Sequence, residues 1–179
     1  VIALACLLGA SCRAEERTPQ SLAEFPRGSI ELESASGGTH AISVWIAESP
    51  AHRAQGLMFV RSLAPDTGML FIFPATQYVS MWMKNTYVAL DMLFVDRAGR
   101  IVNIAENARP LTLDTIDSAA PVLAVLELPA GAVKRFGLRP GDRVISIDGR
   151  PLRTWDELVA SVRAHPGERL NLELKRGDE

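Results

Sequence analysis

The chain has 179 residues, enough for one ordinary domain or for one domain with a small addition. Hydrophobic residues make up 47% and charged residues 22%, as in a typical globular protein, so the composition argues against wholesale disorder. The formal net charge is −2, aromatic residues make up only 6%, and basic residues form no stripe, so we expect no binding to nucleic acid.

Residues 1–14 are predicted to be a truncated signal peptide. The chain starts with an apolar run that is as long as the hydrophobic part of a signal peptide and too short to span a bilayer. Two small residues precede Cys12, as at a lipoprotein cleavage site, although Gly9 stands where such sites usually have leucine. We therefore expect an exported protein of bacterial type, periplasmic or held at the envelope by a lipid on Cys12. Cleavage after Ala14 is the competing interpretation, and a buried helix of a cytoplasmic protein is a third.

The cysteines Cys6 and Cys12 both lie in this N-terminal segment. The folded part should therefore contain no disulfide framework, no cysteine-based zinc site and no thiol nucleophile. Residues 15–27 are polar and include two prolines, which predicts an extended, solvated tether.

The body of the chain, residues 28–136, is predicted to consist mostly of short strands. Ile30 and Leu32 alternate with polar residues, and residues 41–46 are rich in β-branched side chains, so both segments favour a strand. Further strands are expected at residues 69–73, 78–83, 92–95, 101–104 and 122–128.

Local signals also predict a helix and a turn in the body. Ser49 can cap a helix in which Pro50 takes the first position, and this helix should end near Gly56. Residues 96–99 predict a tight connection between two strands, with Gly99 placed for a positive φ.

Residues 137–179 have a different pattern, in which a strand at 143–147 is followed by a hairpin turn. Thr154 and Glu157 have the spacing of a capping box at the start of a helix. An alternating segment, residues 170–174, predicts a final strand. The apolar residues of the helix recur at spacings of three and four and form one stripe: Trp155, Leu158, Val159 and Val162.

A series of short motifs follows in order along the body. They are Arg53, Gly56-Leu57-Met58, Arg61, Gly68-Met69-Leu70-Phe71, Trp82-Met83-Lys84-Asn85-Thr86, Leu90-Asp91, Val125-Leu126-Glu127-Leu128, Ala130-Gly131 and Gly141-Asp142. With these motifs the chain, from about residue 40 to residue 144, resembles a bacterial and archaeal family known as domain of unknown function 192. The resemblance implies a compact, β-rich and usually exported domain, and it brings no settled activity.

From about residue 137 to residue 176 the chain also resembles the later half of a bacterial PDZ domain. The matching segments are Gly137-Leu138-Arg139-Pro140-Gly141-Asp142, Ile147-Asp148-Gly149 and the helix from Thr154 to Ala164. Pro129-Ala130 lies farther upstream than the PDZ pattern requires, and the sequence stops inside what resembles a hairpin turn. The expected fold is therefore α+β and β-rich: a compact, barrel-like, mostly antiparallel sheet with short helices, followed by a partial PDZ-like strand–hairpin–helix–strand unit.

The two resemblances compete for one strand, residues 142–147. Three interpretations stay open: a natural fusion with a shared strand, a tandem that has lost its linker, or a fragment of a longer reading frame. If this strand pairs with residues 170–175, a second structural module exists.

Residues with the chemistry of a catalytic or metal site are sparse. His40, His52 and His165 have no metal-ligand neighbour at helical spacing, and neither a phosphate-binding loop nor a nucleophile elbow is present. We therefore expect no cofactor, and a binding role rather than an enzymatic one.

The most polar part of the family motif is a candidate site for a small polar ligand. Trp82 could stack on a ligand, Lys84 could hold an anion, and the polar groups of Asn85 and Thr86 could form hydrogen bonds to it. The plainer alternative is that Lys84 pairs with Asp91 while the two polar residues cap a turn. An acid–base pair of Lys84 and Asp91 would instead make the protein an enzyme.

Three other groups of residues are further candidates. Arg53 and Arg61 could bind an acidic group, or they could tie the short helix to the sheet through carboxylate or carbonyl contacts. Met81 and Met83 would lie on one strand face, where thioethers could bind Cu(I) or simply fill the core. The stripe that contains Trp155 could line a groove for protein C-termini or extended peptides.

The leading hypothesis is an exported or envelope-tethered binding or accessory module with a PDZ-like segment for protein contact. The Lys84/Asp91 enzyme and the Cu(I)-binding protein are the alternatives.

Overall fold

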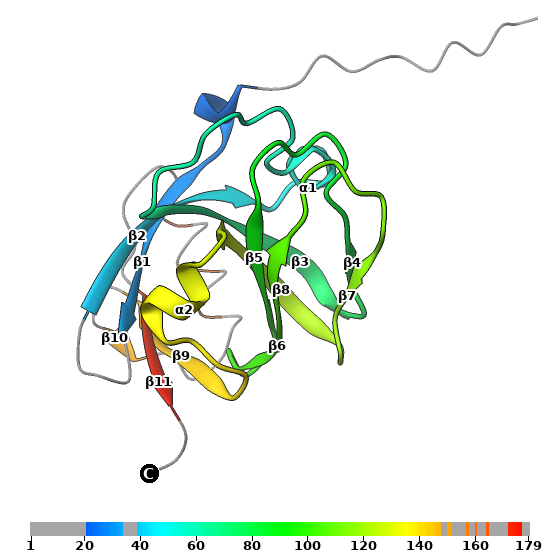
Figure 1. The fold of residues 1–179 in the computed structure, drawn as a ribbon. Coiled ribbons are helices and arrows are strands. Elements are labelled where there is room, and N and C mark those ends of the chain that lie inside the picture. The colour runs from blue at the N-terminus through cyan, green and yellow to red at the C-terminus, as the bar shows by residue number, and fades with distance from the viewer. Residues whose placement is uncertain are drawn as a thin grey trace, which may run out of the picture.

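The computed structural model describes residues 21–33, 39–147, 150–151, 157, 160, 164 and 172–176 (Figure 1). Its elements, in chain order, are the 3-10 helix η1 (Leu22–Glu24), β1 (Arg27–Glu33), β2 (Thr39–Ala47), α1 (Pro50–Gln55), β3 (Thr67–Gln77), β4 (Ser80–Met81), β5 (Leu90–Val95), β6 (Ile101–Ala108), β7 (Ile116–Asp117), β8 (Val122–Pro129), α2 (Ala132–Phe136), β9 (Asp142–Ile147), β10 (Arg150–Pro151) and β11 (Leu172–Arg176). Among these residues, no helix is both long and apolar enough to cross a membrane.

Six strands form the main sheet, in the order β1-β2-β3-β8-β5-β6. Every neighbouring pair is antiparallel except β2 and β3, which run parallel. The expectation of a β-rich fold with a mostly antiparallel sheet and short helices is confirmed. A separate two-stranded sheet joins β4 to β7.

Buried side chains form one cluster on each face of the main sheet. Along β5, Leu93 and Val95 belong to the first cluster, whereas Met92 and Phe94 belong to the second. This alternation follows from the period of two in a strand. The first cluster also contains residues of α2, and the second contains Leu57, which directly follows α1.

The predicted helix at residues 50–56 is confirmed as α1. Ser49 is its N-cap, and the Ser49 hydroxyl accepts the backbone N–H of His52 at 3.0 Å. Pro50 occupies the first turn, where its missing N–H costs no hydrogen bond. Gly56 is the C-cap at φ 53°, and a Cβ there would lie 2.9 Å from the Phe71 ring.

Two strand predictions need correction. β3 continues through Pro74, where we expected it to end, because the register with β8 shifts between Ile72 and Gln77 and the ladder there needs no N–H from proline. The strand predicted at 78–83 is reduced to Ser80–Met81. The chain then turns, since the backbone N–H of Thr86 bonds to the Met83 carbonyl and Asn85 adopts φ 56°.

The predicted tether, residues 15–27, includes residues that belong to the fold. Residues 21–26 contain η1, which is closed by a capping box between Ser21 and Glu24, and β1 begins at Arg27. Phe25 is only 3% exposed and stacks on the His52 ring with centroids 4.2 Å apart. The burial of this one aromatic side chain attaches the segment to the second cluster.

Strand β9 belongs to a three-stranded sheet in the order β10-β9-β11. It pairs with β11 over residues 172–176, so a second structural module exists. A single bridge between Arg143 of β9 and Arg100 connects this module with the β5–β6 turn, and the Gly141 N–H bonds to the Ile101 carbonyl. Within the predicted helix at 154–164, the described residues Glu157, Ala160 and Ala164 are helical.

Candidate functional site

The carboxyl group of Glu127 lies within the main sheet. Glu127 of β8 is paired with Met69 of β3 on one side and with Met92 of β5 on the other. Directly opposed residues of antiparallel strands share a face, so these three side chains are neighbours on the face of the second cluster. Met69 and Met92 are fully buried, and Glu127 is only 4% exposed.

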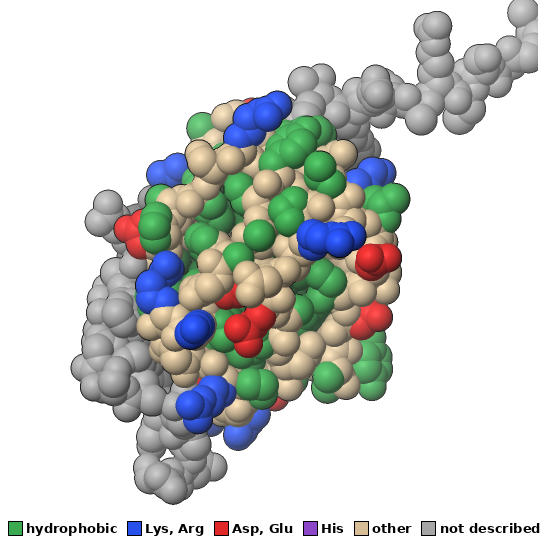
Figure 2. Space-filling view, in the orientation of Figure 1, with side chains coloured by type: hydrophobic (Ala, Val, Ile, Leu, Met, Phe, Trp, Pro, Cys, Tyr) green, Lys and Arg blue, Asp and Glu red, His purple; other side chains and the backbone are tan. Residues whose placement is uncertain are grey.

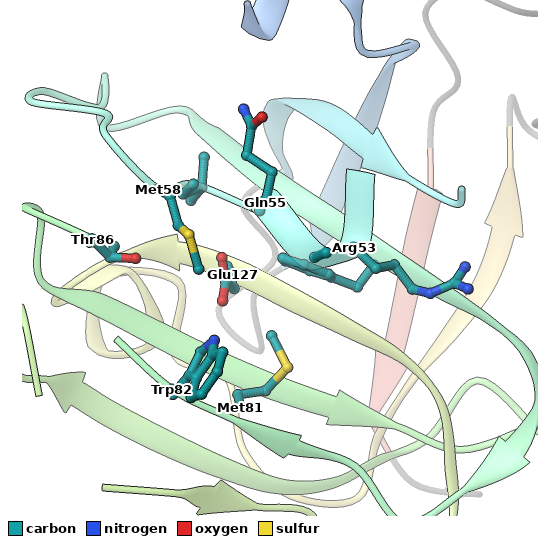
Figure 3. Close-up of a pocket in the computed structure, with 11 residues that line it drawn as sticks. Arg53, Gln55, Met58, Met81, Trp82, Thr86 and Glu127 are labelled. Atoms are coloured by element: carbon teal, nitrogen blue, oxygen red, sulfur yellow. The ribbon is translucent and has the colours of Figure 1, made fainter. Parts of the chain in front are cut away.

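The Glu127 carboxyl lines a pocket with a cavity volume of about 30 Å³ (Figure 3). The walls come from α1 and the residues after it, from the end of β4 and from the following turn. Figure 3 shows the side chains of Met58, Met81 and Trp82 directed toward the carboxyl, with Thr86 at the edge. We call this space the Glu127 pocket.

Burial raises the pKa of Glu127 from 4.5 to about 8. Desolvation is the cause, and the side chain forms no hydrogen bond or ion pair with any residue that the structure describes. At neutral pH the group is therefore mostly a neutral carboxylic acid, which can both donate and accept a hydrogen bond. Trp45 Nε1 is the one fully enclosed side-chain nitrogen or oxygen without a partner among the described residues, so the Glu127 carboxyl oxygens retain access to the pocket. A carboxyl group in this position is available to a ligand.

Two loops contribute residues to the pocket lining, and backbone hydrogen bonds join them to each other and to a third loop. We call residues 57–61, 82–87 and 109–113 the rim loops. The N–H of Phe59 bonds to the Asn85 carbonyl at 2.8 Å, and the N–H of Leu111 bonds to the Thr86 carbonyl at 3.2 Å. Phe59, Asn85 and Leu111 all have positive φ, at 67°, 56° and 63°. Asparagine adopts this region readily, whereas Phe59 and Leu111 have a strained backbone there, and such strain often occurs at functional sites.

The rim loops expose aromatic side chains to solvent. Phe59, Trp82 and Tyr87 are 43%, 49% and 39% exposed. The Lys84 ammonium lies 5.3 Å from the Trp82 ring centroid, and the Arg61 guanidinium lies 5.0 Å from that of Tyr87. Each cation thus lies over an aromatic ring, in the arrangement of a cation–π pair. On the face drawn in Figure 2, basic and acidic side chains are spread out rather than gathered by sign.

Arg53 has the structural role that we gave as the plainer alternative. Its guanidinium donates hydrogen bonds to the backbone carbonyls of Glu48 and Ile72, the latter at 3.0 Å. It also lies 5.7 Å from the Phe73 ring centroid. The side chain therefore ties α1 to β3, and its charged end points away from Glu127 in Figure 3.

Asp91 is not placed beside Lys84 in a polar site. Its side chain is fully buried, and its two oxygens accept the backbone N–H groups of Asn107 and Val133, each at 2.9 Å. Lys84 is exposed on the rim, so neither the predicted pair with Asp91 nor an open acid–base arrangement of these two residues is found. Because both oxygens are used by the backbone, Asp91 holds the fold together.

The structure thus brings together only some of the predicted site residues. Trp82 and Thr86 line the pocket, and Lys84, Asn85 and Arg61 belong to its rim. Met81 lines the pocket, whereas Met83 is fully buried in the second cluster, so these two do not form a pair. The predicted groove residues Trp155, Leu158, Val159 and Val162, and Cys12, lie outside the described residues.

Glu127 and Met58 are pocket residues that we did not propose as site residues from the sequence. Both belong to family motifs, Val125-Leu126-Glu127-Leu128 and Gly56-Leu57-Met58. A further signal for Glu127 is that it is the one acidic residue in the apolar run from Val122 to Leu128. In the described part of the chain, no three His, Cys, Asp or Glu side chains are grouped so that they could hold a metal ion.

Comparison with known proteins gives two family matches. The family model of DUF192, described as an uncharacterized ACR, matches residues 32–146, and a PDZ-domain model matches residues 129–176. The two matches overlap at residues 129–146, which contain α2 and most of β9. The overlap supports a strand that is shared between two modules.

Two solved structures resemble part of this chain. A candidate transcription regulator from Sinorhizobium meliloti 1021 is 53% identical, with a TM-score of 0.64 over 66% of this chain and 92% of that one. A protein of unknown function from Novosphingobium aromaticivorans is 36% identical, with a TM-score of 0.59 over 66% of this chain and 81% of that one.

Curated relatives match a shorter part of the chain. Zinc metalloprotease RasP of Geobacillus kaustophilus is 46% identical over 56 residues, and regulator of sigma-E protease RseP of Escherichia coli K12 is 43% identical over 56 residues. Each match covers 31% of this chain, but the chain spans only 13% and 12% of the lengths of these two proteases. Since the DUF192 model covers more than half of the sequence, this chain belongs to the DUF192 family of uncharacterized proteins.

Proposed function

We propose that the β-rich domain is a binding module that holds a small ligand group in the Glu127 pocket. The observation that carries the proposal is the Glu127 side chain: the residue is only 4% exposed, its carboxyl borders a cavity, and it has no hydrogen-bond partner among the described residues. Folding that leaves a polar group in this state costs free energy, and a bound ligand would recover it.

The arrangement supports binding rather than catalysis. Acid–base chemistry usually needs a second titratable group that faces the same reacting atoms. Glu127 and Arg53 are the two titratable side chains among the pocket-lining residues, and the Arg53 guanidinium is bonded to backbone carbonyls. Asp91, which the sequence suggested as the partner of Lys84 in an acid–base pair, accepts hydrogen bonds from backbone N–H groups.

The size of the cavity limits what enters it. A volume of about 30 Å³ accommodates an ion, a water molecule or the end of a larger molecule. The remainder of a larger ligand would lie on the rim loops, where Phe59, Trp82 and Tyr87 are partly exposed. Backbone hydrogen bonds from Phe59 to Asn85 and from Leu111 to Thr86 join these loops.

Amide-resolved NMR tests this proposal with three small probes of different charge: acetamide, methylammonium and acetate. We expect at least one of them to shift the Trp82 indole and Thr86 amide signals in a saturable way at pH 7. Glu127→Leu should abolish the shifts, whereas the exposed control Glu106→Leu should retain them. Absence of a saturable shift with all three probes, or full retention in Glu127→Leu, would contradict the proposal.

A second binding function is proposed for the C-terminal module. A PDZ domain binds peptides that add a strand to its sheet, and both the PDZ match and the β9–β11 pairing support such a role here. The apolar N-terminal run supports our proposal that the protein is exported. Fluorescence anisotropy with labelled C-terminal peptides of apolar sequence tests the first point. Saturable binding that Val159→Glu removes is expected, and binding that is absent from the wild-type chain would contradict it.

A further inference from the structure

Building on the proposed function, we infer that the ligand of the Glu127 pocket is a soft monovalent metal ion, Cu(I) or its analogue Ag(I). The Glu127 carboxylate and the thioether sulfurs of Met58 and Met81 would be its ligands. The three side chains come from β8, from the segment after α1 and from β4, and all three line one cavity.

The arrangement of methionines around Glu127 is the first argument. Met58 and Met81 line the cavity, and in Figure 3 their side chains approach the carboxyl from different sides. The two cross-strand neighbours of Glu127 are also methionines, Met69 and Met92. Four of the five methionines in the chain therefore adjoin one carboxyl group. Thioether sulfur is a soft ligand that prefers Cu(I) to hard or borderline cations.

Charge and size are the second argument. Binding of the ion would release the Glu127 proton to solvent, since a ligating carboxyl group must be ionised. The resulting single carboxylate balances a single positive charge, whereas a divalent ion would leave a net charge in a buried site at high cost. The other charged side chain of the pocket, Arg53, directs its guanidinium to two carbonyls and away from the cavity. A cavity of about 30 Å³ fits a bare ion rather than a hydrated one with a full shell of waters.

The choice of ligands differs from the pair that the sequence suggested. Met83 is fully buried, does not line the cavity and packs in the second cluster. Met83 is therefore a matched control for Met58 and Met81, because it is the same residue type in the same part of the fold. Trp82 lies beside the site at the mouth of the cavity, so its fluorescence should report the bound ion.

The test is a titration of the full chain with Ag(I) in chloride-free buffer, repeated with Cu(I) under anaerobic conditions against a chromophoric Cu(I) chelator. All proteins carry Cys6→Ser and Cys12→Ser, because thiols would bind both ions. We expect one equivalent to bind, to raise the Tm and to quench Trp82, with Trp82→Phe losing the quenching. Met58→Leu and Met81→Leu should each weaken binding at least about tenfold, while Met83→Leu should change it less than about twofold.

The experiments distinguish a wrong choice of metal ligand from a wrong assignment of the pocket as a binding site. If neither ion binds, or if Met58→Leu and Met81→Leu bind as tightly as Met83→Leu, the inference is overturned. In that case saturable shifts with acetamide, methylammonium or acetate would still uphold the pocket as a binding site. Thermal unfolding without metal shows for each variant that a loss of binding is not a loss of folding.

Discussion

The buried carboxylate of Asp91 on β5 accepts the backbone N–H of Val133 in α2 at 2.9 Å, and its second oxygen accepts the N–H of Asn107. Asp91, which belongs to a family motif and was a candidate for an acid–base pair, thus attaches α2 to the sheet. The residues from α2 onward also lead into β9, so this contact supports the junction between the two modules.

Asp91→Asn should destabilise the protein by about 2–4 kcal/mol, because the amide nitrogen would face a backbone N–H that needs an acceptor. Chemical denaturation measures the loss. Asp114→Asn, at an exposed position, is the control and should change the free energy of unfolding by less than about 0.5 kcal/mol. An Asp91→Asn variant as stable as this control would show that Asp91 does not hold α2.

Arg53→Lys should lower the free energy of unfolding by about 1–3 kcal/mol. The guanidinium donates to two carbonyls, those of Glu48 and Ile72. Lysine has a shorter side chain that ends in a single ammonium group, and it cannot reproduce both hydrogen bonds. Urea unfolding of the variant gives the value. Arg109→Lys, which changes an exposed side chain, should be neutral, and an equal effect of both substitutions would argue against a specific role for Arg53.

Gly68→Ala should cost more than about 2 kcal/mol or prevent folding. A Cβ at this position would lie 2.5 Å from the Glu127 backbone oxygen and 2.8 Å from Leu128, so the β3–β8 pairing would have to move. Gly28→Ala is the control, since its Cβ would meet the Ile46 side chain at 3.4 Å, an ordinary contact. Tm values of the two variants provide the comparison, and equal values would contradict this account.

The stability of the protein should fall between about pH 4.5 and pH 8 through Glu127, whose pKa burial raises to about 8. In this range the unfolded chain has released the proton that the native protein still holds, so unfolding becomes easier as the pH rises. Above about pH 8 the Glu127 carboxyl is ionised in both the native and the unfolded state, so its contribution to the free energy of unfolding no longer changes with pH. The size of the effect is on the order of a few kcal/mol.

Urea unfolding of the wild type and of Glu127→Gln across this range isolates the effect. Every other titratable group is present in both proteins, so the contributions of these groups cancel in the comparison. The Gln variant should be the more stable protein at high pH and should lack the slope. Parallel curves for the two proteins would show that Glu127 has an ordinary pKa.

Much of the fold could be predicted from local sequence. Ser49, Pro50 and Gly56 specify α1 through capping alone, and the alternating apolar residues specify the strands, because both signals depend on neighbouring residues. Pro74 was misjudged, since its position at a register shift depends on β8, which lies far along the chain. Phe25 was missed for the same reason, because its stacking partner His52 is distant in sequence.

The site could be predicted only in part. Trp82 and Thr86 belong to a dense polar motif, and the structure places both at the pocket. Glu127 becomes conspicuous only when β3 and β5 lie on either side of it and when α1 covers it. Sheet register and burial, rather than spacing along the chain, decide that this carboxyl has no partner.

The state of the Glu127 carboxyl in the ligand-free protein tests the central claim most directly. Carbon-13 NMR of the side-chain carboxyl, assigned with Glu127→Gln, follows its titration without any probe molecule. We predict a neutral carboxylic acid at pH 7 and a midpoint near 8. A midpoint near 4.5 would mean that the group is hydrated or already paired, and the account of an open, unpartnered binding carboxyl would then be wrong.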